Sequence, residues 1–417
     1  APVFAEDKGI LAILVMVAFA LKILSFLLDK KETYKANAFD ILVLAFAAMN
    51  IIATAASHYL LPSIKGLSKM AVYFCSYFLF LSTLGRSPKK RSLLLICSVL
   101  LSGFLVSLYG LYQYKIGVAP LATWEDPNVE EKTTRVYSTL KNPNLLAGYL
   151  VPLIPLSISL AFMSFCQSGW KKLLSIPALG CAGAIALCCV FTGSRGGYMG
   201  IGAAFAGLAI VMLGSAWQAK PKLRPLFLLT FLVAPVILAL ILHQFPSYEH
   251  RILSIFAGRE HSSNSYRLNV YVASFKMFLD SWWLGVGPGN STFKLAYGLY
   301  MRSGFDALGT YCVPLEVAVE TGVLGLFIFA WMVMAAVARA HESFWENLNM
   351  PERWLKAGAT SALFGMMIHG LVDTVYYRPQ VQFVFWLLLA LCVCGIAGKK
   401  EPELGSRTEE ILSSGES

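Results

Sequence analysis

Three arginines could bind an anion. Arg195 lies in a short turn, 192–197, between two apolar runs, and two glycines follow it. A charge at the edge of a bilayer is costly and is therefore a functional candidate. Because a guanidinium offers a planar fork that matches two phosphate oxygens, we expect Arg195 to bind an anion rather than to form a structural salt bridge. Arg267 is a similar candidate, and Arg135 is a weaker one.

A histidine and an aspartate form a second candidate group. His369 precedes Asp373 by four residues near the outer end of an apolar run. This spacing places both side chains on one helix face. The pair could be a catalytic dyad, or it could orient the end of a helix, and the spacing fits both interpretations.

Two other patterns give no site. The histidines near residues 243–261 lack the spacing of a zinc site, so we expect no metal. The glycines of residues 285–289 follow an amphipathic segment and two tryptophans instead of a strand. We interpret them as a tight turn and not as a nucleotide-binding loop.

The composition indicates a membrane protein. Of the 417 residues, 57% are hydrophobic and 14% are charged, whereas a soluble domain is roughly 25% charged. About eleven continuous apolar runs are long enough for helices that cross a bilayer: 9–28, 39–59, 70–84, 93–112, 145–165, 173–191, 198–213, 226–242, 313–336, 355–372 and 381–396. The sequence therefore predicts an all-α polytopic membrane protein.

Basic residues predict the orientation. The net charge of +10 comes from short clusters between the apolar runs, such as 86–91. Such clusters mark cytoplasmic loops, which argues against nucleic acid as a partner. They place the amino terminus outside and the tail inside. Because the chain begins at Ala1, a preceding helix or a cleaved signal is expected before it.

The runs divide the chain into four parts. We expect N-terminal membrane helices over residues 1–243, an extracytoplasmic loop over 244–312, C-terminal membrane helices over 313–397, and a disordered cytoplasmic tail over 398–417. In the loop, apolar residues recur at helical spacing from Leu268 to Leu279. This segment predicts an amphipathic helix on the membrane surface, with Arg267 in its first turn.

Several motifs resemble the O-antigen ligase and polymerase superfamily in their order and spacing. They are Lys141–Tyr149, Thr192–Gly197, Tyr266-Arg267, Trp283–Asn290 and Glu316–Gly325. This resemblance covers the chain from Arg135 to the last helix and implies about twelve helices. Members are metal-independent glycosyltransferases of lipopolysaccharide or polysaccharide biosynthesis, without a cofactor. They move a glycan from a polyprenyl diphosphate, such as undecaprenyl diphosphate, to a lipid-linked or glycan acceptor at the outer face of the bacterial inner membrane.

The resemblance implies roles for the candidate residues. Arg195 and Arg267, with Arg135 as a weaker candidate, would hold the diphosphate. Tyr311 stands where the ligases carry a histidine that is proposed to activate the acceptor. A tyrosine, whose pKa is about 10, is a poor base near neutral pH. The remaining candidates for activating the acceptor are His369, Asp373, Glu316 and Glu320.

The chain resembles one subgroup of this superfamily more closely, a subgroup that has been linked to inorganic-carbon accumulation. This closer resemblance rests on the segments 307–308, 315–322, 369–375 and 377–379, with Tyr311 between the first two. This resemblance keeps two alternatives open: transport of a small anion such as bicarbonate, or a catalytically silent relative that assists another enzyme. We predict a glycosyltransferase, because the arginines gather at the outer side and few charges lie within the apolar runs.

Overall fold

The computed structural model describes residues 8–28, 37–86, 89–119, 135–219, 222, 224–225, 229 and 262–395. Within these ranges the chain is helical and has no strand. Eight of the described helices are long and apolar enough to cross a membrane. The predicted class, an all-α polytopic membrane protein, is confirmed. The tail 398–417 and, except for residue 229, the predicted run 226–242 lie outside the described residues.

The helices follow the apolar runs, because a helix satisfies its own backbone groups where water is absent. In chain order they are α1 (Lys8–Leu28), α2 (Ala38–Ala55), α3 (Leu60–Arg86), α4 (Lys89–Ile116), α5 (Pro143–Leu150), α6 (Leu153–Phe165), α7 (Ser175–Phe191), α8 (Arg195–Ala219), α11 (Ser262–Asp280), α12 (Asn290–Tyr297), α13 (Val313–Glu346), α14 (Arg353–Gly370) and α15 (Pro379–Val393). Short 3-10 turns lie at Ser138–Leu140 and Gly169–Leu174.

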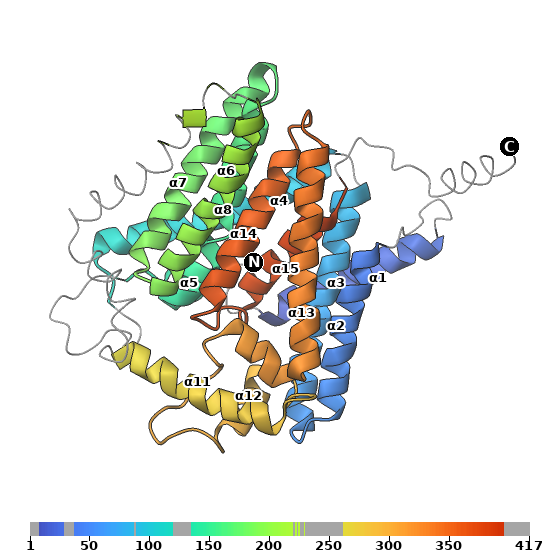
Figure 1. Ribbon diagram of the computed structural model, residues 1–417, viewed down its shortest axis with the longest axis vertical. Helices are drawn as coiled ribbons and strands as arrows, with labels where there is room; N and C mark the ends of the chain where they lie inside the picture. The colour runs from blue at the N-terminus through green and yellow to red at the C-terminus, as the bar shows by residue number, and fades with distance from the viewer. Residues whose placement is uncertain are drawn as a thin grey trace, which may run out of the picture.

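The helices form one bundle with a cap at one end (Figure 1). Helix α14 packs against α6 and α8 on one side and against α13 and α15 on the other. Helices α2 and α3 cover the far side of α13 and α15. The cap consists of α11 and α12, and the connections α6–α7 and α13–α14 lie at the opposite end (Figure 1).

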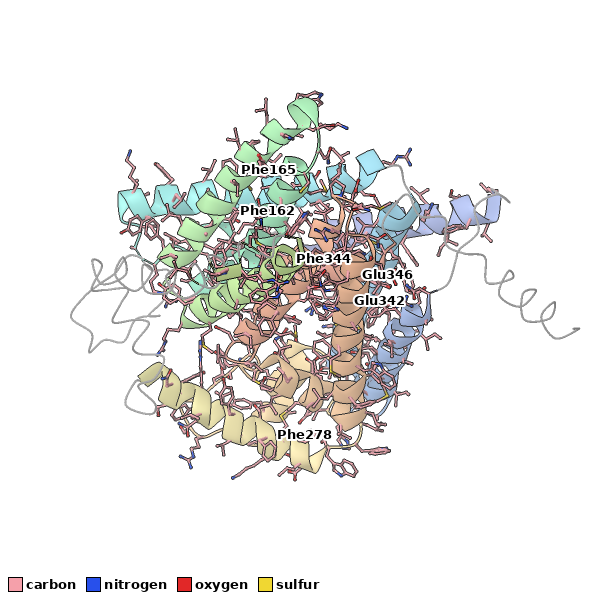
Figure 2. The ribbon with its side chains drawn as sticks, turned by 45° about the horizontal axis from the view of Figure 1, so that its top comes forward. Phe162, Phe165, Phe278, Glu342, Phe344 and Glu346 are labelled. Atoms are coloured by element: carbon pink, nitrogen blue, oxygen red, sulfur yellow. The ribbon has the colours of Figure 1, made fainter. Side chains whose placement is uncertain are left out.

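Aromatic side chains fill the bundle near that opposite end. Phe162 of α6 and Phe344 of α13 both pack on Trp354 of α14, with ring centroids 5.3 and 5.5 Å apart. In Figure 2 both phenylalanines lie far from Phe278 of α11. This aromatic cluster holds α6, α13 and α14 together at that end. The polar groups of α14 described below lie at its other end, next to the cap.

Two helix boundaries differ from the predicted runs. The run 145–165 is divided into α5 and α6 at Val151-Pro152, because a proline has no N–H for the helix ladder. Helix α2 ends at Ala55 and α3 already begins at Leu60. The runs predicted at 39–59 and 70–84 therefore have the wrong limits.

Helix α13 is broken inside its length. Gly322 has φ 71° and ψ −174°, which interrupts the hydrogen-bond ladder. The turn 285–289 fits into this break. The Val286 N–H donates to the Val319 carbonyl at 2.9 Å, and the Gly287 N–H donates to the Glu320 carbonyl at 3.0 Å. On the other side, the Val323 N–H donates to the Trp282 carbonyl at 2.8 Å. The turn therefore satisfies the backbone groups that the break leaves without partners.

The cap helix α11 matches the predicted amphipathic helix. Val270, Ala273 and Met277 are buried. Val272, Phe275 and Leu279 are exposed apolar side chains on its other face. A helix that packs one apolar face on the protein and exposes another is suited to lie on a membrane surface. That α11 lies on the membrane stays a prediction.

Candidate functional site

The start of α8 lies against the end of α14. Gly196 faces the imidazole of His369, and a Cβ on Gly196 would lie only 2.7 Å from the ring atom Cδ2. Gly200 makes a similar approach, with its Cβ position 3.1 Å from the Cβ of His369. The two glycines explain the close contact of the helices, and this contact places the partly buried Arg195 beside the His369 turn.

Arg135 is tied to the turn before α8. Its Nε donates to the Thr192 carbonyl and its Nη2 donates to the Asn144 side chain, both at 3.0 Å. The neighbouring Val136 N–H donates to the Phe191 carbonyl at 3.1 Å. Arg135 and Arg195 therefore belong to one neighbourhood, and Arg135 also holds the turn in place.

Arg267 reaches the end of α14 from the cap. Its Nη2 lies 3.1 Å from Oδ2 of Asp373, and the two side chains are 16% and 6% exposed. The guanidinium also lies over the ring of Tyr311, 5.7 Å from the ring centroid. Because Asp373 is one turn beyond His369, the ion pair connects Arg267 to the neighbourhood of Arg195.

The predicted pairing of His369 with Asp373 is not formed. His369 is fully buried, and neither ring nitrogen has a hydrogen-bond partner among the described residues. Asp373 pairs with Arg267 instead. Helix α14 ends at Gly370, so Asp373 lies beyond the helix and the expected shared helix face does not form. An arginine 106 residues away binds the carboxylate instead, because a bond between two charged groups is stronger than one to a neutral ring.

Tyr311 has a strained backbone that is held by two hydrogen bonds. Its φ of 56° lies in the left-handed region, which is rare for a residue other than glycine. Its N–H donates to the Thr374 hydroxyl at 2.6 Å, and its carbonyl accepts from the Tyr271 hydroxyl at 3.0 Å. The arrangement keeps Tyr311 beside the Arg267–Asp373 pair.

Burial makes the Tyr311 phenol a poor base. Loss of contact with water raises its pKa well above the usual value, and Tyr266 and Asp373 raise it further although Arg267 lowers it. The same cause raises the pKa of Tyr271 to about 12. Both phenols therefore stay protonated near neutral pH, so Tyr311 cannot replace a histidine as a proton acceptor.

Two glutamates of the ligase-like motif lie on the first turns of α13. Glu316 is 8% exposed and its Oε2 has no hydrogen-bond partner among the described residues. Its carboxyl group interacts with the Thr374 hydroxyl, the group that also holds Tyr311. Glu320 is one turn further along, and its Oε1 accepts a hydrogen bond from the Gly289 N–H at 2.8 Å.

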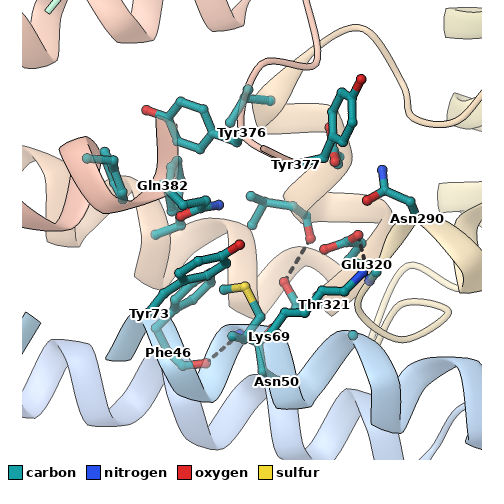
Figure 3. A pocket seen from close by; sticks show the side chains of 18 of the residues that line it. Phe46, Asn50, Lys69, Tyr73, Asn290, Glu320, Thr321, Tyr376, Tyr377 and Gln382 are labelled. Carbon is teal, nitrogen blue, oxygen red and sulfur yellow. Dashed lines mark hydrogen bonds between the residues drawn. The ribbon is translucent and has the colours of Figure 1, made fainter. Parts of the chain in front are cut away.

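Both glutamates line a cavity between α2, α3, α13 and α15, which we call the α13 cavity (Figure 3). Its volume is about 80 Å³, which is room for several water molecules. Asn50, Lys69 and Tyr73 lie on one side of it, and Tyr377 and Gln382 lie on the other (Figure 3). The α13 cavity thus combines aromatic walls with carboxyl, amide and ammonium groups.

Within the described ranges, no three side chains of His, Cys, Asp or Glu come close enough to share a metal ion. The structure instead joins two charged regions: a basic one, with Arg135, Arg195 and Arg267 around the end of α14, and an acidic one, with Glu316 and Glu320 in the α13 cavity. The Thr374 hydroxyl lies between them.

Residues 180–330 match the model of the O-antigen ligase family. The match includes Arg195, Arg267, Tyr311 and both glutamates, and it gives no support to the inorganic-carbon subgroup. No curated protein matches the chain. Residues 180–330 are therefore similar to the O-antigen ligase family, and this match supports the resemblance to the O-antigen ligase superfamily that the motifs indicate.

Proposed function

We propose that the protein is a membrane glycosyltransferase that takes a glycan from a polyprenyl diphosphate and attaches it to an acceptor hydroxyl at the outer face of the inner membrane. The O-antigen ligase domain supports the transfer of a lipid-linked glycan. The observation that supports the finer proposal is that Arg135, Arg267 and the start of α8, which Arg195 opens, lie around the end of α14.

The basic region fits a diphosphate leaving group. When the bond between the anomeric carbon and the phosphate oxygen breaks, negative charge grows on the diphosphate. Fixed cations stabilise this charge, and arginine matches phosphate oxygens with two parallel hydrogen bonds. In this proposal Arg195 and Arg267 bind the diphosphate, and Arg135 holds the turn that carries Arg195.

The ion pair of Arg267 is compatible with this role. Only Nη2 makes the contact with Asp373, and a guanidinium has five N–H donors, so one carboxylate does not exhaust it. Asp373 then orients the guanidinium before the donor arrives. We keep His369 as a neighbour of the basic region and not as half of a dyad, because its ring is buried without a partner among the described residues.

The acceptor hydroxyl must lose a proton as it attacks the anomeric carbon. Among the candidates for this step, Tyr311 stays protonated, and Asp373 is held by Arg267. The glutamates of α13 remain, and they lie next to the basic region. For small-anion transport, no observation on the described residues offers support.

The test is glycan transfer by the purified full chain in lipid nanodiscs, with a polyprenyl-diphosphate glycan as donor. Arg195→Ala and Arg267→Ala should each reduce the release of polyprenyl diphosphate by about 100-fold or more, as the loss of one fixed donor of this kind does. Arg302→Ala is the matched control, because Arg302 is an exposed arginine of the cap region. Equal activity in all four proteins would remove the proposed diphosphate site.

A further inference from the structure

A second cavity lies where the end of α11 meets the connection of α2 to α3 (Figure 1), and we call it the α11 pocket. It is lined by residues 56, 58, 59 and 280–286, and its volume is about 270 Å³. The Ser57 hydroxyl donates to the Val286 carbonyl at 2.5 Å and so ties the two segments together. Because pockets for drug-sized molecules begin at roughly 300 Å³, the α11 pocket suits a small polar headgroup and not a glycan chain.

One carboxylate sets the charge of the α11 pocket. Asp280 is the only acidic residue among the lining residues that the structure describes, and none of them is a lysine or an arginine. Its Oδ2 accepts a hydrogen bond from the Tyr300 hydroxyl at 2.8 Å. Over the described ranges no lysine or arginine forms an ion pair with it. The pocket therefore presents a negative charge that a cationic ligand would balance.

Aromatic rings in the wall narrow the cation to an organic ammonium group. Tyr59, Trp282 and Trp283 line the pocket, and the two indole rings meet edge to face with their centroids 5.1 Å apart. Aromatic faces attract an ammonium group, and the face of tryptophan does so most strongly. A bare metal ion would need several oxygen ligands, whereas an ammonium group with its methylene groups matches one carboxylate among rings.

The surroundings of the pocket indicate that this ammonium group belongs to a lipid. Trp282 and Trp283 are 52% and 51% exposed, and tryptophan is enriched where a bilayer meets water. Leu279, directly before Asp280, and Leu61, at the start of α3, are exposed as well. Acyl chains can cover these apolar side chains while the headgroup enters the pocket.

We propose that the α11 pocket binds the headgroup of a phospholipid with a primary ammonium group, such as phosphatidylethanolamine. The ammonium group donates hydrogen bonds to the Asp280 carboxylate and lies against the tryptophan rings. The phosphate accepts a hydrogen bond from the imidazole of His58, which lines the pocket from the connection of α2 to α3. A choline headgroup has the same charge but no N–H to donate, so we expect it to bind more weakly. This lipid site does not depend on glycan transfer.

A bound headgroup would also stabilise the break in α13. Gly285 and Val286 line the pocket and belong to the turn that fits into this break. A ligand that binds only the folded protein raises its unfolding temperature. The lipid around the protein should therefore determine how firmly the turn is held.

The first experiment measures which lipid the parent prefers. The purified full chain in detergent is titrated with dioleoyl phosphatidylethanolamine, phosphatidylcholine or phosphatidylglycerol, and the complexes are counted by native mass spectrometry. We expect phosphatidylethanolamine to bind about 10-fold more tightly than phosphatidylglycerol, as the loss of one hydrogen bond between charged groups implies, with phosphatidylcholine between them. Equal affinities for the three lipids would overturn the proposal.

A competition separates a lipid from a soluble ammonium compound. Glycerophosphoethanolamine carries the same headgroup without acyl chains, so we expect it to displace the bound phosphatidylethanolamine only at much higher concentration. If it binds as tightly as the lipid, the pocket recognises a soluble compound and the assignment to a lipid is wrong.

The second experiment tests the carboxylate. Asp280→Asn should bind phosphatidylethanolamine about 10-fold more weakly and phosphatidylglycerol no more weakly than the parent. The matched control is Asp306→Asn, because Asp306 is an exposed aspartate of the cap region whose carboxylate pairs with the exposed Lys294 at 3.3 Å. It should bind both lipids like the parent. Unchanged binding of phosphatidylethanolamine by Asp280→Asn would overturn the role of this residue.

The unfolding temperature of the parent keeps the proposal testable if Asp280→Asn does not fold. In nanodiscs that contain phosphatidylethanolamine, the parent should unfold at a higher temperature than in nanodiscs of phosphatidylglycerol alone. Equal unfolding temperatures would contradict the expected stabilisation.

Discussion

At the scale of single residues, the Arg267–Asp373 pair decides how the basic region is prepared for a ligand. Both side chains are mostly buried, and removing one partner of a buried pair leaves the other charge without compensation. In the proposed function the aspartate positions the arginine, and the arginine contacts the donor. The two residues should respond differently to substitution.

The first prediction concerns Asp373→Asn, which keeps the shape of the side chain and removes its charge. We expect it to destabilise the fold by about 3 kcal/mol, and to weaken donor binding because Arg267 loses its orientation. The measurements are the unfolding temperature in detergent and the KM for the donor. The prediction fails if the unfolding temperature and the KM both match those of the parent.

The second prediction concerns Tyr311→Phe. Burial raises the pKa of this phenol, so the group is uncharged in the folded protein from about pH 6 to 9, and its protonation adds no pH dependence in that range. We expect the variant to transfer glycan at the rate of the parent, with the same pH–rate profile. If the pH–rate profile of the variant lacked the acidic or the alkaline limb of the parent's profile, Tyr311 would exchange a proton during turnover.

At the scale of elements, the break in α13 and the turn 285–289 form one structural unit. A Cβ on Gly322 would lie 2.2 Å from the Trp283 carbonyl oxygen, and the φ of 71° disfavours any other residue. The two glutamates of the α13 cavity lie directly before this break. Their placement therefore depends on Gly322.

The third prediction follows from this contact. Gly322→Ala should lower the unfolding temperature by several degrees and reduce glycan transfer, because the turn 285–289 must shift and Glu320 moves with it. Gly202→Ala is the control, since nothing lies within 4 Å of its Cβ position on α8. An alanine inside a helix stabilises by about 0.5–1 kcal/mol relative to glycine, so the control should be as stable as the parent or more so. Equal unfolding temperatures for the two variants would contradict the role of Gly322.

The elements also show how far the sequence predicts the fold. The long apolar runs predicted most helices, because hydrocarbon leaves the backbone little choice. They did not predict the limits of α3, the short helix α12 or the break at Gly322. These features depend on contacts between distant segments. Lys356 is a further case: a lysine so close to the start of α14 would be expected to face water, yet it is 3% exposed and its ammonium group donates to carbonyls at the end of α15.

At the scale of the whole molecule, the cap and the basic connections lie at opposite ends of the bundle (Figure 1). If basic connections face the cytoplasm, then α11, α12 and the basic region face outward. This orientation is a proposal that follows from charge and shape together. It requires the donor to be reached from the outer leaflet.

The fourth prediction tests that orientation by thiol labelling with a membrane-impermeant maleimide. Leu299 is 78% exposed next to α12, so Leu299→Cys should be labelled in intact cells. The native Cys166, which is exposed at the end of α6, should be labelled only after lysis and serves as the internal reference. The reverse pattern would place the basic region in the cytoplasm.

The sequence indicated candidate residues, but it did not indicate their contacts with one another. The three arginines were identified by their residue type and position. The structure places Arg135, Arg267 and the start of α8 around the end of α14, and an anion site formed by the three arginines stays a prediction. It could not be predicted that Arg267 pairs with Asp373 across 106 residues, or that Thr374 lies between the basic region and the α13 cavity. Spacing along one helix suggested His369 as the partner of Asp373. A contact between helices replaced it, and no local pattern in the sequence indicates such a contact.

The turn that fits into α13 has a consequence for the biogenesis of the protein. A ribosome synthesises residues 285–289 before it synthesises α13, so the partners of the broken helix already exist when that helix reaches the membrane. An interrupted helix that entered hydrocarbon alone would carry unpaired carbonyl groups, each at a cost of several kcal/mol. Because the turn comes before α13 in the chain, α13 can be inserted into the membrane without exposing the unpaired backbone groups at its break to lipid. A circular permutation that placed α13 ahead of the turn would reverse this order.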